Sequence, residues 1–145
     1  MQKFITKSYN ETVKLAQKFA KTLEKGTVIA YLGDLGAGKT AFTQGLAKGL
    51  GITDDVTSPT FAICNQYSGN GVNLYHFDMY RVESWDDLYS TAFFDYLDTD
   101  AYIAVEWSEN VYGALPDDIT VVVDIKKLSD NEREITIYNK SEGND

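Results

Sequence analysis

The chain has 145 residues, 43% of them hydrophobic, and its 13 basic and 22 acidic residues give a net charge of −9. This length predicts a single globular domain with a hydrophobic core of its own. Nucleic-acid binders draw most of their affinity from basic side chains, and only Arg81 and Arg133 are arginine. Independent binding to RNA or DNA is therefore not expected, whereas a basic protein partner would suit this charge.

The sequence also favours a cytoplasmic location. No hydrophobic run approaches the roughly 18 residues that span a bilayer, and the N-terminal stretch lacks the apolar core of a secretory signal. The single cysteine, Cys64, has no second thiol with which to pair within the chain. A lone cysteine in a strand-like run is typical of a buried thiol in a reducing compartment.

The first predicted helix begins at Ser8, which has the spacing of a capping box with Glu11. Hydrophobic residues recur at helical spacing over 13–23, and we expect Gly26 to end this helix.

The next three segments form a strand, a loop and a helix. The run TVIAYL at 27–32 is short, apolar and β-branched, which favours a buried parallel strand. The glycine-rich loop GDLGAGKT at 33–40 follows, and a helix is predicted from about 39 to 50. Gly49 and Gly51 are expected to close that helix.

A polar loop at 52–60 precedes two strand-like runs, FAICNQY at 61–67 and VNLYHF at 72–77. The connection SGNG predicts that they form a hairpin.

The remaining pattern predicts one further helix and three further strands. Ser84 is the expected N-cap of a helix that continues to Tyr96. The run AYIAVE at 101–106 predicts a buried strand, and the runs 119–125 and 133–138 predict a closing hairpin. The tail from about Asn139 is expected to be frayed. The fold class is thus α/β, a single P-loop domain with a mostly parallel central sheet, antiparallel additions and flanking helices.

The loop at 33–40 fulfils the phosphate-binding pattern in full, with Gly33, Gly38, Lys39 and Thr40 at the required spacing. Gly36 and Gly38 allow successive backbone N–H groups to point at a phosphate, and the following helix adds the positive end of its dipole. Lys39 would reach the β- and γ-phosphates, and the Thr40 hydroxyl would bind Mg²⁺. The strand before the loop and the helix after it are the context that this motif requires.

Two carboxylates are candidates to serve a bound metal ion, because each follows a predicted strand. Ligands of α/β sheets lie beyond the carboxyl ends of the strands, and Glu106 ends the more hydrophobic of the two runs. We therefore assign Glu106 to the metal, directly or through water. Asp78 would orient water or support the metal ligands.

The segment VTSPTF at 56–61 is interpreted either as a switch-like loop near the γ-phosphate or as an ordinary polar turn. Arg81 could stabilise transition-state charge, but pairing with Asp78 or Glu83 is the favoured interpretation.

Three other features have a favoured structural interpretation. Trp107 is more typical of the core, although its position beside Glu106 would let it cover the site. His76 is interpreted as a structural residue on a strand face. The segment Asn139–Glu142 resembles the guanine-reading motif but has Glu in place of Asp, so a Ras-like GTPase is not predicted.

Four blocks in this order, GDLGAGKT, SPTF, HFDMYRVES and VEWSE, followed by a closing hairpin, resemble the TsaE family. Its members are P-loop ATPases of bacterial tRNA threonylcarbamoyladenosine biosynthesis, and the likeness runs from about Thr12 to Arg133. The resemblance implies a cytoplasmic protein that binds ATP or ADP with Mg²⁺ and acts with the proteins TsaB and TsaD. Hydrolysis would be weak alone, stimulated by these partners and needed for repeated cycles, and tRNA would be reached only through the complex.

The resemblance also implies roles for individual residues. The catalytic positions would be Asp78, Glu106 and Thr60, with Thr60 in the switch-like role, and the metal ligands would be Thr40 and Glu106. The nucleotide-binding positions would be Asp34, Leu35, Gly36, Ala37, Gly38, Lys39, Thr40, Thr12, Trp107 and Arg133. This chain departs from the family at Thr91-Ala92, where a Leu-Gly pair is usual, so the helix there could lie differently.

Two other functions are compatible with a phosphate-binding loop. A small-molecule kinase typically closes an arginine-bearing lid over the phosphates, and this chain has few arginines for one. A nucleotide-gated binding module would bind nucleotide without significant hydrolysis.

Overall fold

A computed structural model describes residues 1–33, 38–53, 56, 64–97 and 99–142. The elements, in chain order, are β1 (Gln2–Thr6), α1 (Tyr9–Ala20), β2 (Val28–Gly33), α2 (Lys39–Gly49), β3 (Cys64–Gly69), β4 (Val72–Asp78), α3 (Trp85–Ser90), α4 (Phe93–Leu97), β5 (Tyr102–Glu106), the 3₁₀ turns η1 (Ser108–Asn110) and η2 (Tyr112–Ala114), β6 (Thr120–Lys127) and β7 (Arg133–Asn139). Within these ranges, no helix is both long and apolar enough to span a bilayer.

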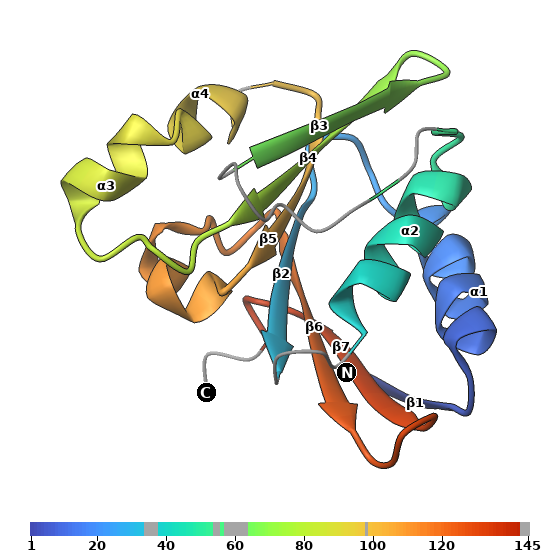
Figure 1. Cartoon of the computed structure of the whole chain (residues 1–145). Coiled ribbons are helices and arrows are strands. Elements are labelled where there is room, and N and C mark those ends of the chain that lie inside the picture. Colours follow the sequence, from blue (N-terminus) through green and yellow to red (C-terminus); the bar gives the residue numbers. More distant parts are fainter. Residues whose placement is uncertain (34–37, 54–55, 57–63, 98, 143–145) are drawn as a thin grey trace.

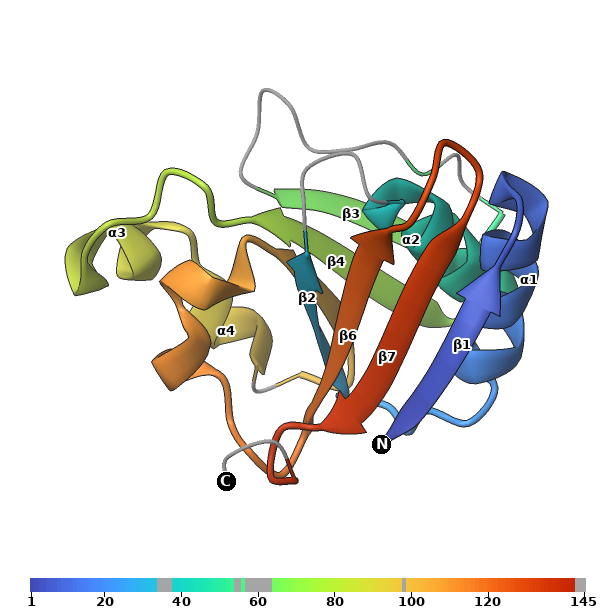
Figure 2. The same ribbon diagram turned by 90° about the horizontal axis from the view of Figure 1, so that it is seen from below.

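Seven strands form one mixed sheet in the order β1-β7-β6-β2-β5-β4-β3. The four central strands β6, β2, β5 and β4 run parallel, and β1, β7 and β3 are antiparallel to their neighbours. Helices α1 and α2 cover one face of the sheet, and α3, α4 and the 3₁₀ turns lie on the other face (Figures 1 and 2). The predicted fold class is confirmed.

The alternation of side chains along β2 divides the core between the two faces. Ile29 and Tyr31 pack toward α1 and α2, whereas Val28 and Ala30 pack with Phe93 of α4 on the opposite face. These four side chains of β2 are fully buried. This two-sided burial explains why the segment is hydrophobic without polar alternation.

Two glycines of α2 allow close contact with α1. A Cβ atom added at Gly45 would lie 2.3 Å from the carbonyl oxygen of Val13, and one at Gly49 would lie 2.4 Å from that of Gln17. Gly49 is the last residue of α2, as predicted, and it also allows this close packing against α1. Gly51 closes that helix as predicted, with a φ of +85°.

Helix α1 begins as predicted, but it ends earlier. The Ser8 hydroxyl accepts a hydrogen bond from the backbone N–H of Glu11 at 3.1 Å. The helix ends at Ala20, and Gly26 lies in the turn before β2 with a φ of +87°.

The predicted hairpin between β3 and β4 is present. Asn70 and Gly71 both have positive φ, at 53° and 74°, which is the backbone pattern of a type I′ turn. Residues 61–63 of the first predicted run lie outside the described residues.

The prediction of a single helix from Ser84 to Tyr96 is wrong, because this segment forms two short helices, α3 and α4. Ser84 caps α3 as predicted by accepting the Asp87 N–H at 3.1 Å. Ala92 then adopts a left-handed conformation with a φ of 64°, and α4 starts at Phe93. No glycine in the sequence announces this break.

Strand β1 was not predicted, and the expected fraying from Asn139 does not extend over the described tail. Asn139 ends β7, and Lys140 is buried. The Lys140 ammonium donates to the carbonyl oxygens of Tyr112 and Leu115 at 2.9 and 2.6 Å and lies 2.9 Å from an Asp117 carboxylate oxygen. The segment that resembles a guanine-reading motif therefore holds the 3₁₀ turns against the sheet.

Candidate functional site

The carboxyl ends of the central parallel strands bring the candidate residues to one edge of the sheet. Asp78 ends β4 and Glu106 ends β5, and the two residues are register partners. Because side chains alternate along a strand, both belong to the sheet face that α2 covers. The two carboxylates that the sequence singles out therefore lie side by side, next to the end of β2.

Helix α2 places Lys39 at this same edge. The helix starts directly after Gly38, which has a φ of +111°, and residues 34–37 lie outside the described residues. Lys39 is only 6% exposed, and no carboxylate in the described part of the chain forms an ion pair with it. Burial of an ammonium group is unfavourable unless an anion compensates its charge. The first turn of α2 is thus suited to an anionic ligand.

A chain of hydrogen bonds fixes this first turn. The Thr43 hydroxyl donates to the Lys39 carbonyl oxygen at 2.8 Å and lies 2.7 Å from the Tyr31 hydroxyl. Because the Thr43 hydroxyl proton is used in the bond to Lys39, the Tyr31 hydroxyl is the donor to Thr43. Burial also raises the pKa of Tyr31 far above its usual value, so the phenol keeps its proton. The Ser108 hydroxyl donates to the Tyr31 carbonyl oxygen at 2.7 Å. Strand β2 therefore links the start of α2 to η1.

Glu106 has a close neighbour that the sequence interpretation did not pair with it. The Nε2 atom of His76 lies 2.5 Å from a carboxylate oxygen of Glu106. The histidine side chain is fully buried, and Glu106 is 13% exposed. The imidazole of His76 therefore packs directly against the carboxylate at the end of β5. The only sequence signal for this contact is that His76 precedes Asp78 by two residues and therefore shares its sheet face.

Asp78 holds the turn that follows β4. One of its carboxylate oxygens accepts the N–H of Tyr80 at 2.9 Å. The second oxygen leaves Asp78 capacity for a further hydrogen bond.

Trp107 bridges the lysine and this turn. Its backbone is left-handed, with a φ of 57°. The Lys39 ammonium lies 5.5 Å from the centre of the indole ring, and the Tyr80 ring centroid lies 4.9 Å from it. The indole therefore lies beside the candidate site and also packs against the core.

Arg133 also lies beside the start of α2. A Cβ atom at Gly38 would be 3.7 Å from the Arg133 Nε atom. Its Nη1 donates to the carbonyl oxygens of Ser129 and Glu132 at 2.8 and 3.0 Å. The loop between β6 and β7 thereby positions this guanidinium group near the phosphate-binding pattern.

The other predicted residues lie in different settings. Thr12 is buried in the first turn of α1, and its hydroxyl lies 2.7 Å from that of Thr6. Arg81 is exposed and, among the described residues, forms no ion pair with Asp78 or Glu83, so the favoured pairing is wrong. Thr60 and the loop residues Asp34, Leu35, Gly36 and Ala37 lie outside the described residues.

The donor set can accommodate Mg²⁺ bound together with a nucleotide. No group of three His, Cys, Asp or Glu side chains suited to a metal occurs in the described ranges. Mg²⁺ often takes only one or two protein carboxylates and fills its coordination with phosphate oxygens and water. The Thr40 hydroxyl and Glu106 suit that kind of site, but they do not suit a metal bound without nucleotide.

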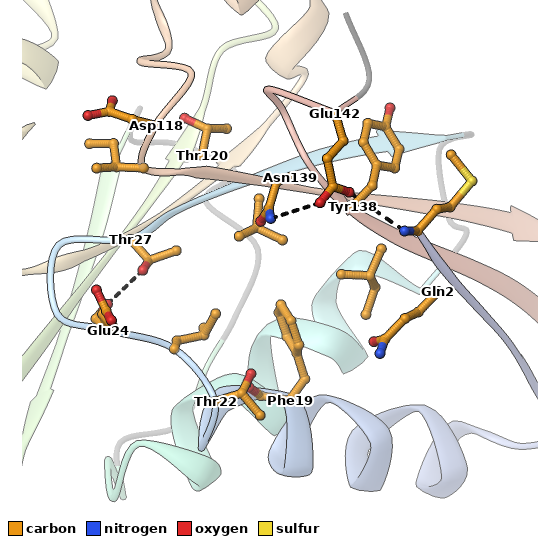
Figure 3. A pocket seen from close by; sticks show the side chains of 15 residues that line it. Gln2, Phe19, Thr22, Glu24, Thr27, Asp118, Thr120, Tyr138, Asn139 and Glu142 are labelled. Atoms are coloured by element: carbon orange, nitrogen blue, oxygen red, sulfur yellow. Dashed lines mark hydrogen bonds and ion pairs between the residues drawn. The ribbon is translucent and has the colours of Figure 1, made fainter.

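A second concave region lies at the opposite edge of the sheet. A cavity of about 440 Å³ is lined by residues from α1, β1, β6 and β7, and Figure 3 shows Glu24, Asp118 and Glu142 at its wall. The terminal amine of Met1 lies 3.6 Å from Glu142. Acidic groups repel phosphate, so this cavity is not a nucleotide site.

A parallel strand, a glycine loop, a buried lysine at a helix start and carboxylates on neighbouring strands define an α/β protein of the P-loop type. Its chain superimposes on the crystal structure of Bacillus subtilis YdiB with a TM-score of 0.77 and 36% identity, over 95% of this chain and 84% of that one.

Sequence comparison identifies the family. The model of the threonylcarbamoyl adenosine biosynthesis protein TsaE matches residues 6–135. The TsaE protein of Bacillus subtilis is 41% identical over 134 residues, which cover 92% of this chain and 83% of that protein. The TsaE protein of Aquifex aeolicus is 37% identical over 142 residues, which cover 97% and 98%. This chain belongs to the TsaE family, whose proteins take part in tRNA threonylcarbamoyladenosine biosynthesis.

Proposed function

We propose that this protein is a Mg²⁺-dependent ATPase, weak alone and stimulated by TsaB and TsaD, in the formation of tRNA threonylcarbamoyladenosine. The buried Lys39 at the start of α2, without a carboxylate partner among the described residues, is the observation that carries this proposal. Anion binding at this position is what a nucleotide phosphate requires. Family membership supports the pathway.

The chain's own residues divide the work of binding. Lys39 and the backbone N–H groups at the start of α2 would hold the β- and γ-phosphates, together with the loop Asp34–Ala37. Thr40 and Glu106 would hold Mg²⁺, which when bound neutralises phosphate charge. Trp107, Arg133 and Thr12 would line the nucleotide.

Hydrolysis would use Asp78, the second carboxylate at the carboxyl ends of the parallel strands. A water molecule attacks the γ-phosphorus, the bond from that phosphorus to the bridging oxygen of the β-phosphate breaks, and ADP, phosphate and a proton are released. Asp78 would orient this water, and its position directly opposite Glu106 supports that role. Thr60 would contact the γ-phosphate from the switch-like loop, and Trp107 would limit entry of bulk water.

The charge of the chain supports a division of labour with other proteins. With a net charge of −9, the protein would leave tRNA to TsaB and TsaD and would drive repeated cycles of the complex. We propose that this protein acts in the cytoplasm, as the tRNA pathway of its family supports.

Nucleotide turnover with and without TsaB plus TsaD tests the proposal. We expect weak hydrolysis alone and marked stimulation by the partners. Lys39→Ala should lose nucleotide binding, whereas Glu106→Gln should keep nucleotide and lose at least about tenfold in turnover. Glu24→Gln, an exposed change at the opposite edge, is the matched control and should behave as wild type.

The alternatives give different results in the same assay. Equal turnover with and without partners would refute stimulation. Transfer of the γ-phosphate to a metabolite instead of water would indicate a kinase. Normal tRNA modification by both Lys39→Ala and Glu106→Gln would show that hydrolysis is not the function.

A further inference from the structure

The acidic residues of this chain are concentrated in one continuous segment. Residues 82–125 contain 11 of the 22 acidic residues and none of the 13 basic ones. The segment builds α3, α4, the two 3₁₀ turns, β5 and most of β6. Of these, α3, α4 and the 3₁₀ turns lie on the sheet face opposite α1 and α2 (Figure 2). The net charge of −9 therefore reflects an uneven distribution along the chain, and α3, α4 and η1 carry several of these acidic residues.

Exposed aromatic side chains lie on this segment. Trp85 and Tyr89 of α3 are 61% and 64% exposed. Both rings contact Phe94 of α4, with centroid separations of 6.4 Å and 5.0 Å. We call these three residues the aromatic face. A cluster of exposed aromatic rings on a folded protein commonly marks an interaction site.

The aromatic face is held in a fixed orientation. Leu88 of α3 and Phe93 of α4 are buried, and the Phe93 ring lies 5.3 Å from the ring of Phe77 in β4. The Ser84 cap fixes the start of α3. The two short helices therefore present their outer rings on an anchored support, which reduces the ordering that binding would require.

Exposed acidic residues are the sequence neighbours of two of these rings. Asp86 lies next to Trp85 in α3, and Asp95 lies next to Phe94 in α4; both side chains are exposed. A polyanion such as RNA or an anionic membrane would be repelled here. A protein surface with lysine or arginine around an apolar depression has the complementary charge.

The face continues toward the candidate nucleotide site. A concave region of about 620 Å³ lies beside α3, lined by Tyr80, Arg81, Val82, Glu83, Trp107 and Asn110. Tyr80 and Trp107 contact each other, and Trp107 lies over Lys39. A protein bound across α3 and this region would thus reach the indole that contacts the phosphate-binding lysine.

We propose that the aromatic face and its neighbouring carboxylates form the docking surface for a basic, partly apolar surface of a partner protein. The proposal rests on the proposed function for the identity of that partner, the TsaB–TsaD complex. Docking there connects the partner to the nucleotide site through Tyr80 and Trp107.

The test measures binding of the full-length protein, loaded with ADP and Mg²⁺, to the purified TsaB–TsaD complex. The double variant Trp85→Ala/Tyr89→Ala should bind at least about tenfold more weakly, as loss of aromatic anchors at an interface does. Asp86→Asn/Asp95→Asn should reduce the association rate and the sensitivity to salt. Tyr9→Ala removes a comparably exposed aromatic ring from α1 and should bind as wild type.

Folding is checked by thermal unfolding and by nucleotide turnover of the free protein, both of which the surface variants should retain. Wild-type binding that the Trp85/Tyr89 double variant leaves intact overturns the docking surface alone. Failure of wild type to bind the complex overturns both this surface and the proposed partner. Concentration-dependent self-association that the double variant abolishes assigns the face to a second copy of this chain and likewise overturns the proposal.

Discussion

The left-handed Ala92 between α3 and α4 predicts that a glycine at this position makes the protein more stable. Its φ of 64° costs a non-glycine residue about 1–2 kcal/mol relative to the right-handed conformation. Ala92→Gly removes that strain. It also loses a half-buried methyl group and adds about 0.5–1 kcal/mol of unfolded-state entropy. The expected net gain in the free energy of unfolding is about 0.5 kcal/mol.

Ala114 of η2 is the matched control. It is also half-buried, but it lies in a 3₁₀ turn and its φ is not positive. Ala114→Gly loses the same methyl group and gains the same chain freedom without relief of strain, so it should destabilise the protein by about 1 kcal/mol. The difference between the two variants, about 1–2 kcal/mol, equals the left-handed strain.

Urea unfolding of wild type and both variants measures this difference directly. Equal unfolding slopes would show that the same surface is exposed in all three proteins, so that midpoint differences report stability. If Ala92→Gly destabilised as much as Ala114→Gly, the strain argument would be refuted.

Three further predictions concern the packing, the thiol and the site. Gly45→Ala should destabilise the protein by about 1–3 kcal/mol in urea unfolding, because its Cβ would lie 2.3 Å from a carbonyl oxygen of α1. The control is Gly113→Ala, whose Cβ meets nothing within 4 Å. Its free energy of unfolding should stay within about 0.5 kcal/mol of wild type. Burial raises the pKa of Cys64 to about 11, so the rate of iodoacetamide labelling should rise roughly tenfold per pH unit up to about pH 11; a plateau near pH 9 would contradict this. His76→Phe removes the nitrogen that contacts Glu106 and should lower turnover by about tenfold while ADP affinity changes little. His76→Asn, which restores a polar group, should recover part of that turnover, and an equal loss in both variants would favour a purely structural role.

The elements that the sequence predicted correctly carry their signals locally. The Ser8 and Ser84 caps depend on residues three positions away, and the β3–β4 turn depends on the Asn70-Gly71 pair. Strand β2 is hydrophobic on both faces, which is sufficient to predict burial on both sides. These features need no information about distant parts of the chain.

The predictions from sequence fail where contacts between distant parts of the chain determine the local structure. Strand β1 exists because β7 pairs with it in antiparallel register. Its three strand-favouring residues, Phe4, Ile5 and Thr6, are too short a run to predict a strand on their own. Lys140 is buried because carbonyl oxygens of η2 and the residue after it accept its N–H groups, although its sequence neighbourhood is polar. The break at Ala92 occurs without a glycine, so the sequence gives no sign of it. The buried Leu88 and Phe93 hold the two helices in place despite the backbone strain.

The candidate site also has features that the sequence predicts and features that depend on distant contacts. The rule that ligands lie beyond the carboxyl ends of parallel strands placed Asp78 and Glu106 at one edge, and the register confirms that they are partners. The contact between His76 and Glu106 joins residues two register positions apart on different strands, because His76 pairs with Ala104. Such a contact depends on side-chain conformations, which sequence spacing does not fix.

The side chain of Trp107 lies between the candidate nucleotide site and the turn that leads to α3. A tryptophan with a φ of 57° strains the backbone, and a glycine would occupy this position without that strain. The indole ring contacts both Lys39 and Tyr80, and these contacts offset part of the strain. Both contacts lie between the start of α2 and the turn that leads to α3. The left-handed backbone of Trp107 therefore places one ring against both the lysine at the start of α2 and the turn that leads to α3.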